Sequence, residues 1–138
     1  MDNYVENKLL TDVQPSIHAA SNKMLIRKAK KYPLKNNILY VAEGENNKYL
    51  YSDSCIIDNL VINYDKKITN CKAKFRYRSK DIPVTLEYLN NNEIQVKYEN
   101  GKSITPGQVC ALYLEDRLIG SGIIKEVRKN NEKLWYLL

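Results

Sequence analysis

From residue 36 onward the sequence is a series of short runs rich in β-branched and aromatic residues, with turn residues about every ten positions. Helical periodicity, in which apolar residues recur every three or four positions, is almost absent. Many short strands with regular turns are typical of a small barrel or sandwich. We predict strands at 38–43, 49–52, 56–62, 71–78, 82–89, 93–99, 109–114 and 118–127, and consider a last one at 133–137.

Two of these strands alternate cleanly between apolar and polar residues, which predicts one dry face and one wet face for each. Their apolar positions are Ile82, Val84, Leu86, Tyr88, Ile94, Val96 and Tyr98. Between them, Asn90-Asn91-Asn92 predicts a tight hairpin, because asparagine tolerates left-handed backbone geometry. Asn100-Gly101 is a strong hairpin signal and Pro106-Gly107 is a second turn pair. Gly120 and Gly122 interrupt the 118–127 run, where we expect a bend or a close backbone approach.

Residues 1–34 differ from the rest because they contain Pro15, Pro33 and a basic cluster at 27–31. Residues 24–26 favour a short helix or a docking strand, and a poorly ordered segment is the alternative. The composition, 43% hydrophobic and 28% charged residues, excludes wholesale disorder. We therefore predict an all-β fold: a lead-in segment at 1–35, helical or disordered, and a small antiparallel β-barrel domain at 36–138.

The most informative motif is Cys-Lys-Ala-Lys-Phe-Arg-Tyr-Arg-Ser-Lys at 71–80. In a strand every second side chain faces the same way, so its cations would form a single basic row. The row consists of Lys72, Lys74, Arg76, Arg78 and Lys80. Neighbouring charges in such a row lie roughly 7 Å apart and repel each other. The next strand supplies only Asp81 and Glu87, whereas a phosphate backbone carries regularly spaced negative charges.

The basic row has two interpretations. Either RNA or another polyanion lies along it, or it is a solvated barrel exterior whose charges protect an edge from aggregation. Phe75 and Tyr77 would face away from the cations, so we expect core positions for both, with base stacking as the alternative. The five cations are the residues for which we predict RNA binding.

Signatures of catalysis and metal binding are missing. His18 is the only histidine and has no nucleophile or carboxylate at a recognisable spacing. Cys55, Cys71 and Cys110 are odd in number and form no CxxC pair, which indicates a reducing compartment, the cytoplasm or an organellar matrix. We expect these cysteines to be small buried hydrophobes. The sequence thus predicts no catalytic residue and no metal site.

Four motifs occur in order between about residue 36 and residue 127. They are 37–41 with 50–53, the run 73–78 with 81–84, Thr105-Pro106-Gly107-Gln108, and 118–124. Together they resemble the C-terminal β-barrel of bacterial and organellar tRNA-specific 2-thiouridylases. Ser121 departs from the pattern, because the family often has glycine there.

The resemblance implies an enzyme that uses ATP to activate the wobble uridine of certain tRNAs and then transfers sulfur from a cysteine persulfide. The family's Ser-Gly-Gly-x-Asp-Ser loop and its catalytic cysteines lie in upstream domains, and this chain contains none of them. No cofactor is therefore expected in this chain, while ATP and a persulfide sulfur donor are implied for the complete enzyme.

Two functions follow as hypotheses. The first is a tRNA-binding accessory barrel that is not active alone. The second is a protein-interaction barrel that docks onto a separately encoded catalytic subunit. The expected partners are tRNA and a catalytic adenylating domain or subunit, with no membrane involved. An independent enzyme would instead need a pocket with convergent ionisable groups, which the sequence gives no reason to expect.

Overall fold

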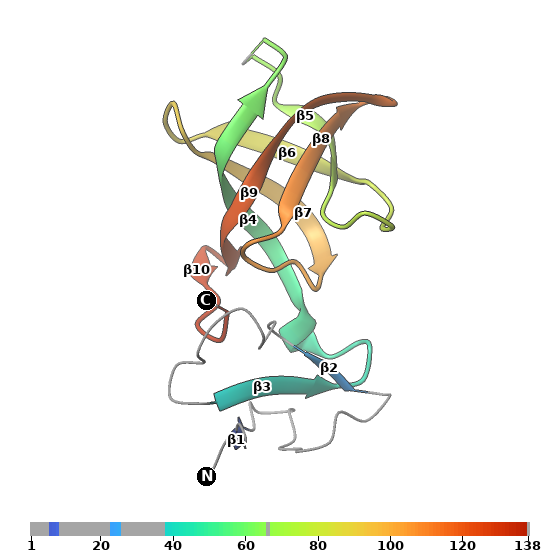
Figure 1. Cartoon of the computed structure of the whole chain (residues 1–138), viewed down its shortest axis with the longest axis vertical. Coiled ribbons are helices and arrows are strands. Elements are labelled where there is room, and N and C mark those ends of the chain that lie inside the picture. The colour runs from blue at the N-terminus through green and yellow to red at the C-terminus, as the bar shows by residue number, and fades with distance from the viewer. Residues whose placement is uncertain (1–5, 9–22, 26–37, 66, 138) are drawn as a thin grey trace. The chain divides into compact units, whose positions relative to one another are not determined.

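The computed structural model describes residues 6–8, 23–25, 38–65 and 67–137 of the chain (Figure 1). The chain divides into two compact units, one formed by Met1–Tyr51 with Trp135–Leu138, and the other by Ser52–Leu134. The boundary predicted between residues 35 and 36 falls outside the described residues and stays a prediction. No helix in the described ranges is long and apolar enough to cross a membrane.

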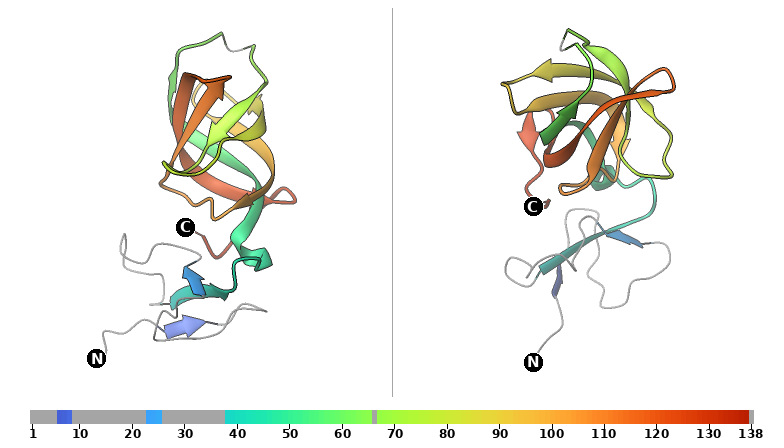
Figure 2. Two further views of the ribbon diagram at one scale, coloured as in Figure 1. Left: turned by 90° about the vertical axis from the view of Figure 1, so that its right-hand side faces the viewer. Right: turned by 45° about the horizontal axis from the view of Figure 1, so that its top comes forward.

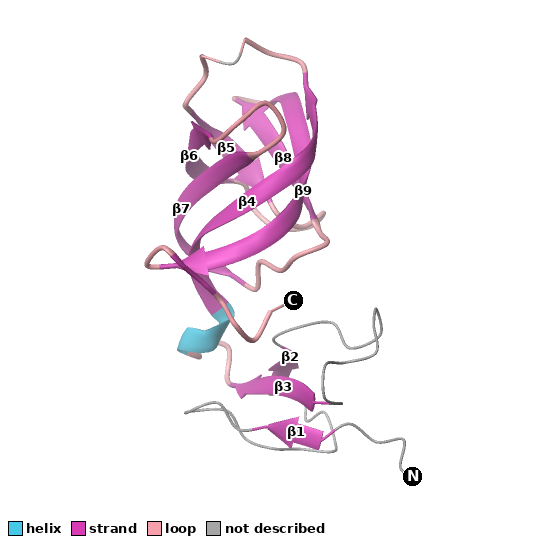
Figure 3. Cartoon of the chain, turned by 90° about the vertical axis from the view of Figure 1, so that its left-hand side faces the viewer, coloured by secondary structure: helices cyan, strands magenta, loops and turns pink. Residues whose placement is uncertain are grey.

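The first unit contains a small sheet in which β3 (Ile38–Glu43) is the middle strand. β1 (Glu6–Lys8) pairs with it in parallel, and β2 (Lys23–Leu25) pairs with it in antiparallel register. Of the alternatives for residues 24–26, the structure thus has a docking strand at 23–25. The basic cluster at 27–31 and His18 lie outside the described residues. A 3-10 turn, Lys48–Leu50, follows, drawn in cyan in Figure 3.

The second unit is a closed antiparallel barrel, which confirms the predicted all-β class (Figures 1 and 2). Around the barrel the strand order is β9-β4-β7-β6-β5-β8, and β8 closes it by pairing with β9. A short extra strand, β10, pairs with the end of β9. The strands are β4 (Tyr51–Ile62), β5 (Asn70–Lys74), β6 (Ile82–Tyr88), β7 (Ile94–Lys102), β8 (Val109–Leu114), β9 (Arg117–Lys129) and β10 (Glu132–Lys133).

The apolar side chains that point inward from alternate strand positions fill the barrel interior. β6 buries Val84 and Leu86 and exposes the residues between them, as predicted from its period of two. Side chains from opposite parts of the sheet fill the centre. The largest that are fully buried are Ile57, Ile94, Leu112, Ile124, Val96 and Val127. Closure therefore lets a short chain bury an apolar core while pairing every sheet edge of the barrel.

Several boundaries differ from the sequence prediction. The runs predicted at 49–52 and 56–62 are joined in the single strand β4, and the last strand is Glu132–Lys133 rather than 133–137. Asn90-Asn91-Asn92 does connect β6 to β7, with Leu89 donating to the Glu93 carbonyl at 3.1 Å. Pro106-Gly107 is also a turn, in which Gly107 has a φ of 90°.

Asn100-Gly101 is not a hairpin turn, and that prediction is wrong. Both residues belong to β7, where Asn100 takes a left-handed φ of 46° inside the strand. A Cβ atom on Gly101 would lie 2.3 Å from the Tyr98 ring. The dipeptide therefore distorts the strand locally and leaves room for an aromatic side chain, a role that glycine also has at bulges.

Gly120 and Gly122 mark the close backbone approach that the sequence predicts. A Cβ atom on Gly120 would lie 2.9 Å from the Val61 carbonyl oxygen, and one on Gly122 would lie 2.9 Å from the Ile57 side chain. Both glycines are on β9 where it crosses β4, beside a register shift in the pairing. The absence of side chains there lets the two strands pack tightly around the barrel.

Candidate nucleic-acid interface

The predicted basic row begins as a strand but does not continue as one. β5 ends at Lys74, and residues 76–79, which we call the basic turn, fold back on themselves. The N–H and hydroxyl of Ser79 both donate to the Arg76 carbonyl, at 3.1 and 2.9 Å. The Arg76 N–H donates in return to the Ser79 hydroxyl at 3.2 Å. The strand predicted at 71–78 is therefore too long, because the serine side chain competes with the sheet for backbone partners.

Shortening the strand changes the geometry of the five predicted cations. Lys72 and Lys74 share the outward face of β5, with Ala73 buried between them. Arg76 and Arg78 lie in the basic turn and Lys80 follows it, so they do not extend one straight row. All five nevertheless lie within one short segment of the barrel surface, and all except the half-buried Lys74 are exposed.

The surface charges of this segment are not neutralised within the part of the chain that the structure describes. None of the five cations forms an ion pair there. Lys74 instead lies over the ring of Tyr113, 5.7 Å from its centroid. Arg76 donates to the Ser103 carbonyl at 2.8 Å. Glu87, one of the acids considered as a neutralising partner, pairs with Lys97 at 2.6 Å.

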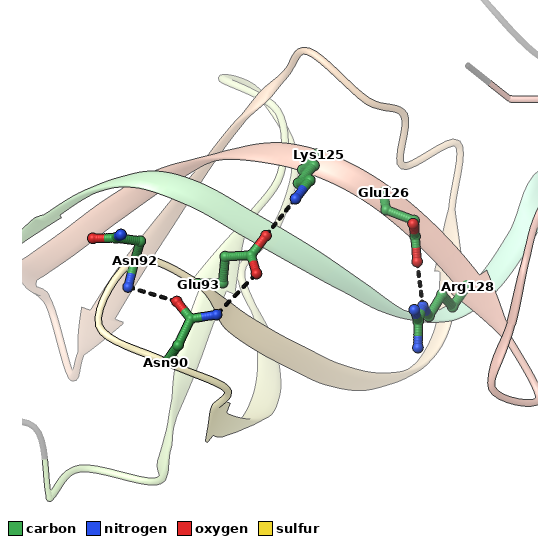
Figure 4. Close-up of polar contacts among 6 residues, drawn as sticks. All are labelled: Asn90, Asn92, Glu93, Lys125, Glu126 and Arg128. Carbon is green, nitrogen blue, oxygen red and sulfur yellow. Dashed lines mark hydrogen bonds and ion pairs between the residues drawn. The ribbon is translucent and has the colours of Figure 1, made fainter.

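Two cations of β9 do form ion pairs (Figure 4). Lys125 pairs with Glu93 at 2.6 Å, and Arg128 pairs with Glu126. The hydrogen bonds from Lys125 and Asn90 lower the pKa of Glu93, and the same contact with Glu93 raises the pKa of Lys125. Glu93 is therefore a fixed carboxylate rather than a proton donor. Within the described residues, the five cations from Lys72 to Lys80 therefore form the longest run along the chain without an ion pair, while Lys67, Lys102, Arg117 and Lys133 are single cations of this kind elsewhere.

The aromatic residues beside the cations have opposite environments. Phe75 is buried and packs edge-to-face on Tyr98, with ring centroids 5.1 Å apart, which confirms its predicted core position. Tyr77 is 92% exposed, so its predicted core position is wrong. The physical reason is the basic turn, because alternation holds only while the backbone stays extended. The Arg-Tyr-Arg-Ser order contains a turn signal, the serine, that a pattern of period two does not register.

Burial disfavours the thiolate form of the three cysteines. Burial raises the pKa of Cys55 to about 12 and that of Cys71 to about 11, and it raises the pKa of Cys110 as well. Cys55 and Cys110 are buried, as expected, whereas Cys71 is half-buried. A thiol attacks only as its thiolate, so burial lowers the reactivity of all three side chains, least that of the half-buried Cys71.

Alkylation tests this assignment. We expect Cys71 to react slowly with iodoacetamide at pH 7.5, and its rate to rise about tenfold per pH unit towards pH 11, because only the thiolate reacts. Cys55 and Cys110 should stay unmodified until the chain unfolds. Mass spectrometry of the labelled peptides measures each site. A cysteine that is fully labelled at pH 7.5 in the folded chain would contradict the assignment.

Comparison with known proteins identifies a family that the chain matches. Residues 52–124 match the family model described as the aminomethyltransferase β-barrel domain. The chain is 41% identical over 104 residues to the tRNA-specific 2-thiouridylase MnmA of Mycoplasmopsis synoviae (strain 53), covering 73% of this chain and 27% of that protein. It is 40% identical over 108 residues to the MnmA of Geobacillus thermodenitrificans (strain NG80-2), covering 75% of this chain and 29% of that protein. The chain thus spans just over a quarter of the length of these relatives, and the matches agree with the resemblance seen in the motifs.

Proposed function

The chain belongs to the aminomethyltransferase β-barrel domain family, in the form found in tRNA-specific 2-thiouridylases, and from this premise we propose that it is a tRNA-binding accessory barrel. In this proposal the complete enzyme uses ATP and a persulfide donor to place sulfur on the wobble uridine, and the barrel holds the tRNA. The chain alone is catalytically incomplete. The observation that carries the proposal is the group of cations at 72–80, which have no ion pair within the described ranges and, apart from Lys74, are exposed.

Physical chemistry supports the choice of a polyanion as the ligand. Like charges that lie close together raise the energy of a surface until counterions or a ligand neutralise them. When protein cations bind the phosphates of a nucleic acid, condensed counterions are released, and this release favours binding. Lys72, Arg78 and Lys80 are exposed and lack ion-pair partners in the described ranges, so they are suited to phosphate contacts. The raised pKa values of the three thiols support the catalytic part of the proposal, since sulfur transfer through a cysteine needs a thiolate.

A second function is favoured by a different observation. Three apolar side chains are exposed near the end of the barrel where β4 finishes and β8 turns into β9: Val61, Leu118 and Leu114 are 58%, 54% and 43% exposed. Exposed apolar groups of this kind occur at protein interfaces. In this alternative the barrel docks onto a separately encoded catalytic subunit, and that subunit supplies the contacts to tRNA.

Binding of unmodified tRNA to the 138-residue chain separates the two functions. With fluorescein-labelled tRNA, we expect saturable binding that weakens steeply between 50 and 200 mM salt, as phosphate contacts require. Fluorescence anisotropy measures it. Heparin, another polyanion, should compete for the same surface. If the chain binds no tRNA at 50 mM salt, the accessory-barrel proposal fails and the docking function takes its place.

A further inference from the structure

We propose that the basic turn is a recognition site for an unpaired nucleobase, which stacks on the ring of Tyr77 while Arg78 and Lys80 contact the adjoining phosphates. The inference rests on the proposed function and goes beyond it by naming the part of an RNA that this surface takes. It is carried by an aromatic ring that is 92% exposed at the tip of a tightly hydrogen-bonded turn.

The turn presents this ring on a rigid support. Three hydrogen bonds between Arg76 and Ser79 close the turn on itself. The Arg76 guanidinium ties it to the loop after β7 by donating to the Ser103 carbonyl at 2.8 Å, and Ser103 holds a left-handed φ of 56°. On the other side, Phe75 is anchored in the core against Tyr98. Because the backbone is already ordered, binding a base costs little conformational entropy.

Tyr77 also has its ring free, unlike the other aromatic residues near it. Phe75 is covered by Tyr98, and the ring of Tyr113 lies beneath the ammonium group of Lys74. Within the described chain Tyr77 forms no hydrogen bond, ring contact or cation contact. Successive bases stack on exposed aromatic side chains in proteins that bind single strands, and any base has a face suited to this contact.

The geometry favours an unpaired base over a duplex. In A-form RNA the faces of the bases are covered by their neighbours, and aromatic side chains reach them only in loops, bulges and single-stranded ends. Arg78 and Lys80 are one and three residues from Tyr77, so their Cα atoms lie at most roughly 4 and 11 Å from the Cα atom of Tyr77. A base on the ring therefore brings its own phosphates next to both cations. The site thus combines the stacking platform and the positive charge that single-strand recognition uses.

Two RNA probes and two substitutions test the inference in the 138-residue chain. The probes are a 12-nucleotide oligouridylate and a 12-base-pair RNA duplex, measured by anisotropy across a salt series. We expect Tyr77→Ala to weaken binding of the oligouridylate by at least about 5-fold, the lower end of the loss when a stacking aromatic is removed. Its effect on the duplex should stay within about twofold, and its salt slope should be unchanged, since no phosphate contact is lost.

Tyr77→Phe and Arg78→Ala are the matched controls. Tyr77→Phe keeps the ring and should bind the oligouridylate as the unchanged chain does. Arg78→Ala removes a phosphate contact and should weaken both probes while reducing the salt slope by about one. If Tyr77→Ala binds the oligouridylate with full affinity, or weakens both probes equally, base stacking is refuted while tRNA binding stands. If the unchanged chain binds neither probe nor tRNA, the proposed function itself is refuted.

Discussion

Replacing Phe75 with alanine should lower the free energy of unfolding by about 3–5 kcal/mol, the usual cost of removing a buried phenylalanine. Phe75 is 6% exposed and contacts Tyr98, so its removal leaves a cavity at the point where the basic turn leaves the barrel. Chemical denaturation followed by far-UV circular dichroism measures the loss. The loss is a large share of the total stability of a typical domain, which is about 5–15 kcal/mol.

Two controls separate packing from chemistry at this position. Phe75→Leu keeps most of the apolar volume and should cost less than about 1.5 kcal/mol. Tyr77→Ala removes an aromatic ring of similar size two residues away, yet its effect should stay within about 0.5 kcal/mol because the ring is 92% exposed. Equal losses for Phe75→Ala and Tyr77→Ala would contradict the assignment of one ring to the core and the other to solvent.

The sequence predicted the barrel because its signals are local and numerous. Alternation of apolar residues identified the dry face of β6, and the asparagine triplet located its hairpin. The hairpin predicted at Asn100-Gly101 was wrong because left-handed backbone geometry also occurs within a distorted strand. At Gly101 a Cβ atom would meet the Tyr98 ring and the Ile104 side chain, a packing contact that a dipeptide turn signal does not register.

The sequence predicted the surface placement of the cations at 72–80 but not their arrangement. The run at 71–80 identified the cations correctly as a surface group, since Lys72, Arg76, Arg78 and Lys80 are exposed. The prediction that every second side chain faces the same way then placed Tyr77 inside the barrel, because this prediction assumes an extended backbone from 71 to 80. The strand ends early because Ser79 bonds to the backbone of Arg76, and because the Arg76 guanidinium finds a carbonyl 27 positions away. The second contact is long-range, and only the folded structure reveals it.

Removing three cations that have no ion pair in the described ranges should together weaken tRNA binding about 100- to 500-fold at 0.1 M salt. The variant combines Lys72→Ala, Arg78→Ala and Lys80→Ala, and each substitution removes one phosphate contact. Through counterion release, each contact raises the logarithm of the binding constant by roughly 0.7–0.9 for a tenfold fall in salt concentration. All three side chains are exposed, so the fold should be kept. Anisotropy with labelled tRNA measures the change in affinity.

A variant with the same change in net charge is the matched control. Lys125→Ala, Arg128→Ala and Lys133→Ala remove three cations from β9 and β10, two of which are already paired with Glu93 and Glu126. Overall electrostatic attraction falls equally in both variants, so a purely non-specific effect would weaken both alike. We expect the control to lose much less affinity than the variant of β5 and the basic turn.

The salt dependence of tRNA binding tests the central claim most directly, because its slope counts the phosphates that the protein neutralises. If all five cations from Lys72 to Lys80 contact phosphates, the log–log slope for the unchanged chain should be roughly −3.5 to −4.5. It should become shallower by roughly 2 to 3 in the variant Lys72→Ala, Arg78→Ala, Lys80→Ala, and should stay near its original value in the control. An equal slope for the unchanged chain and this variant would show that tRNA does not lie along this surface.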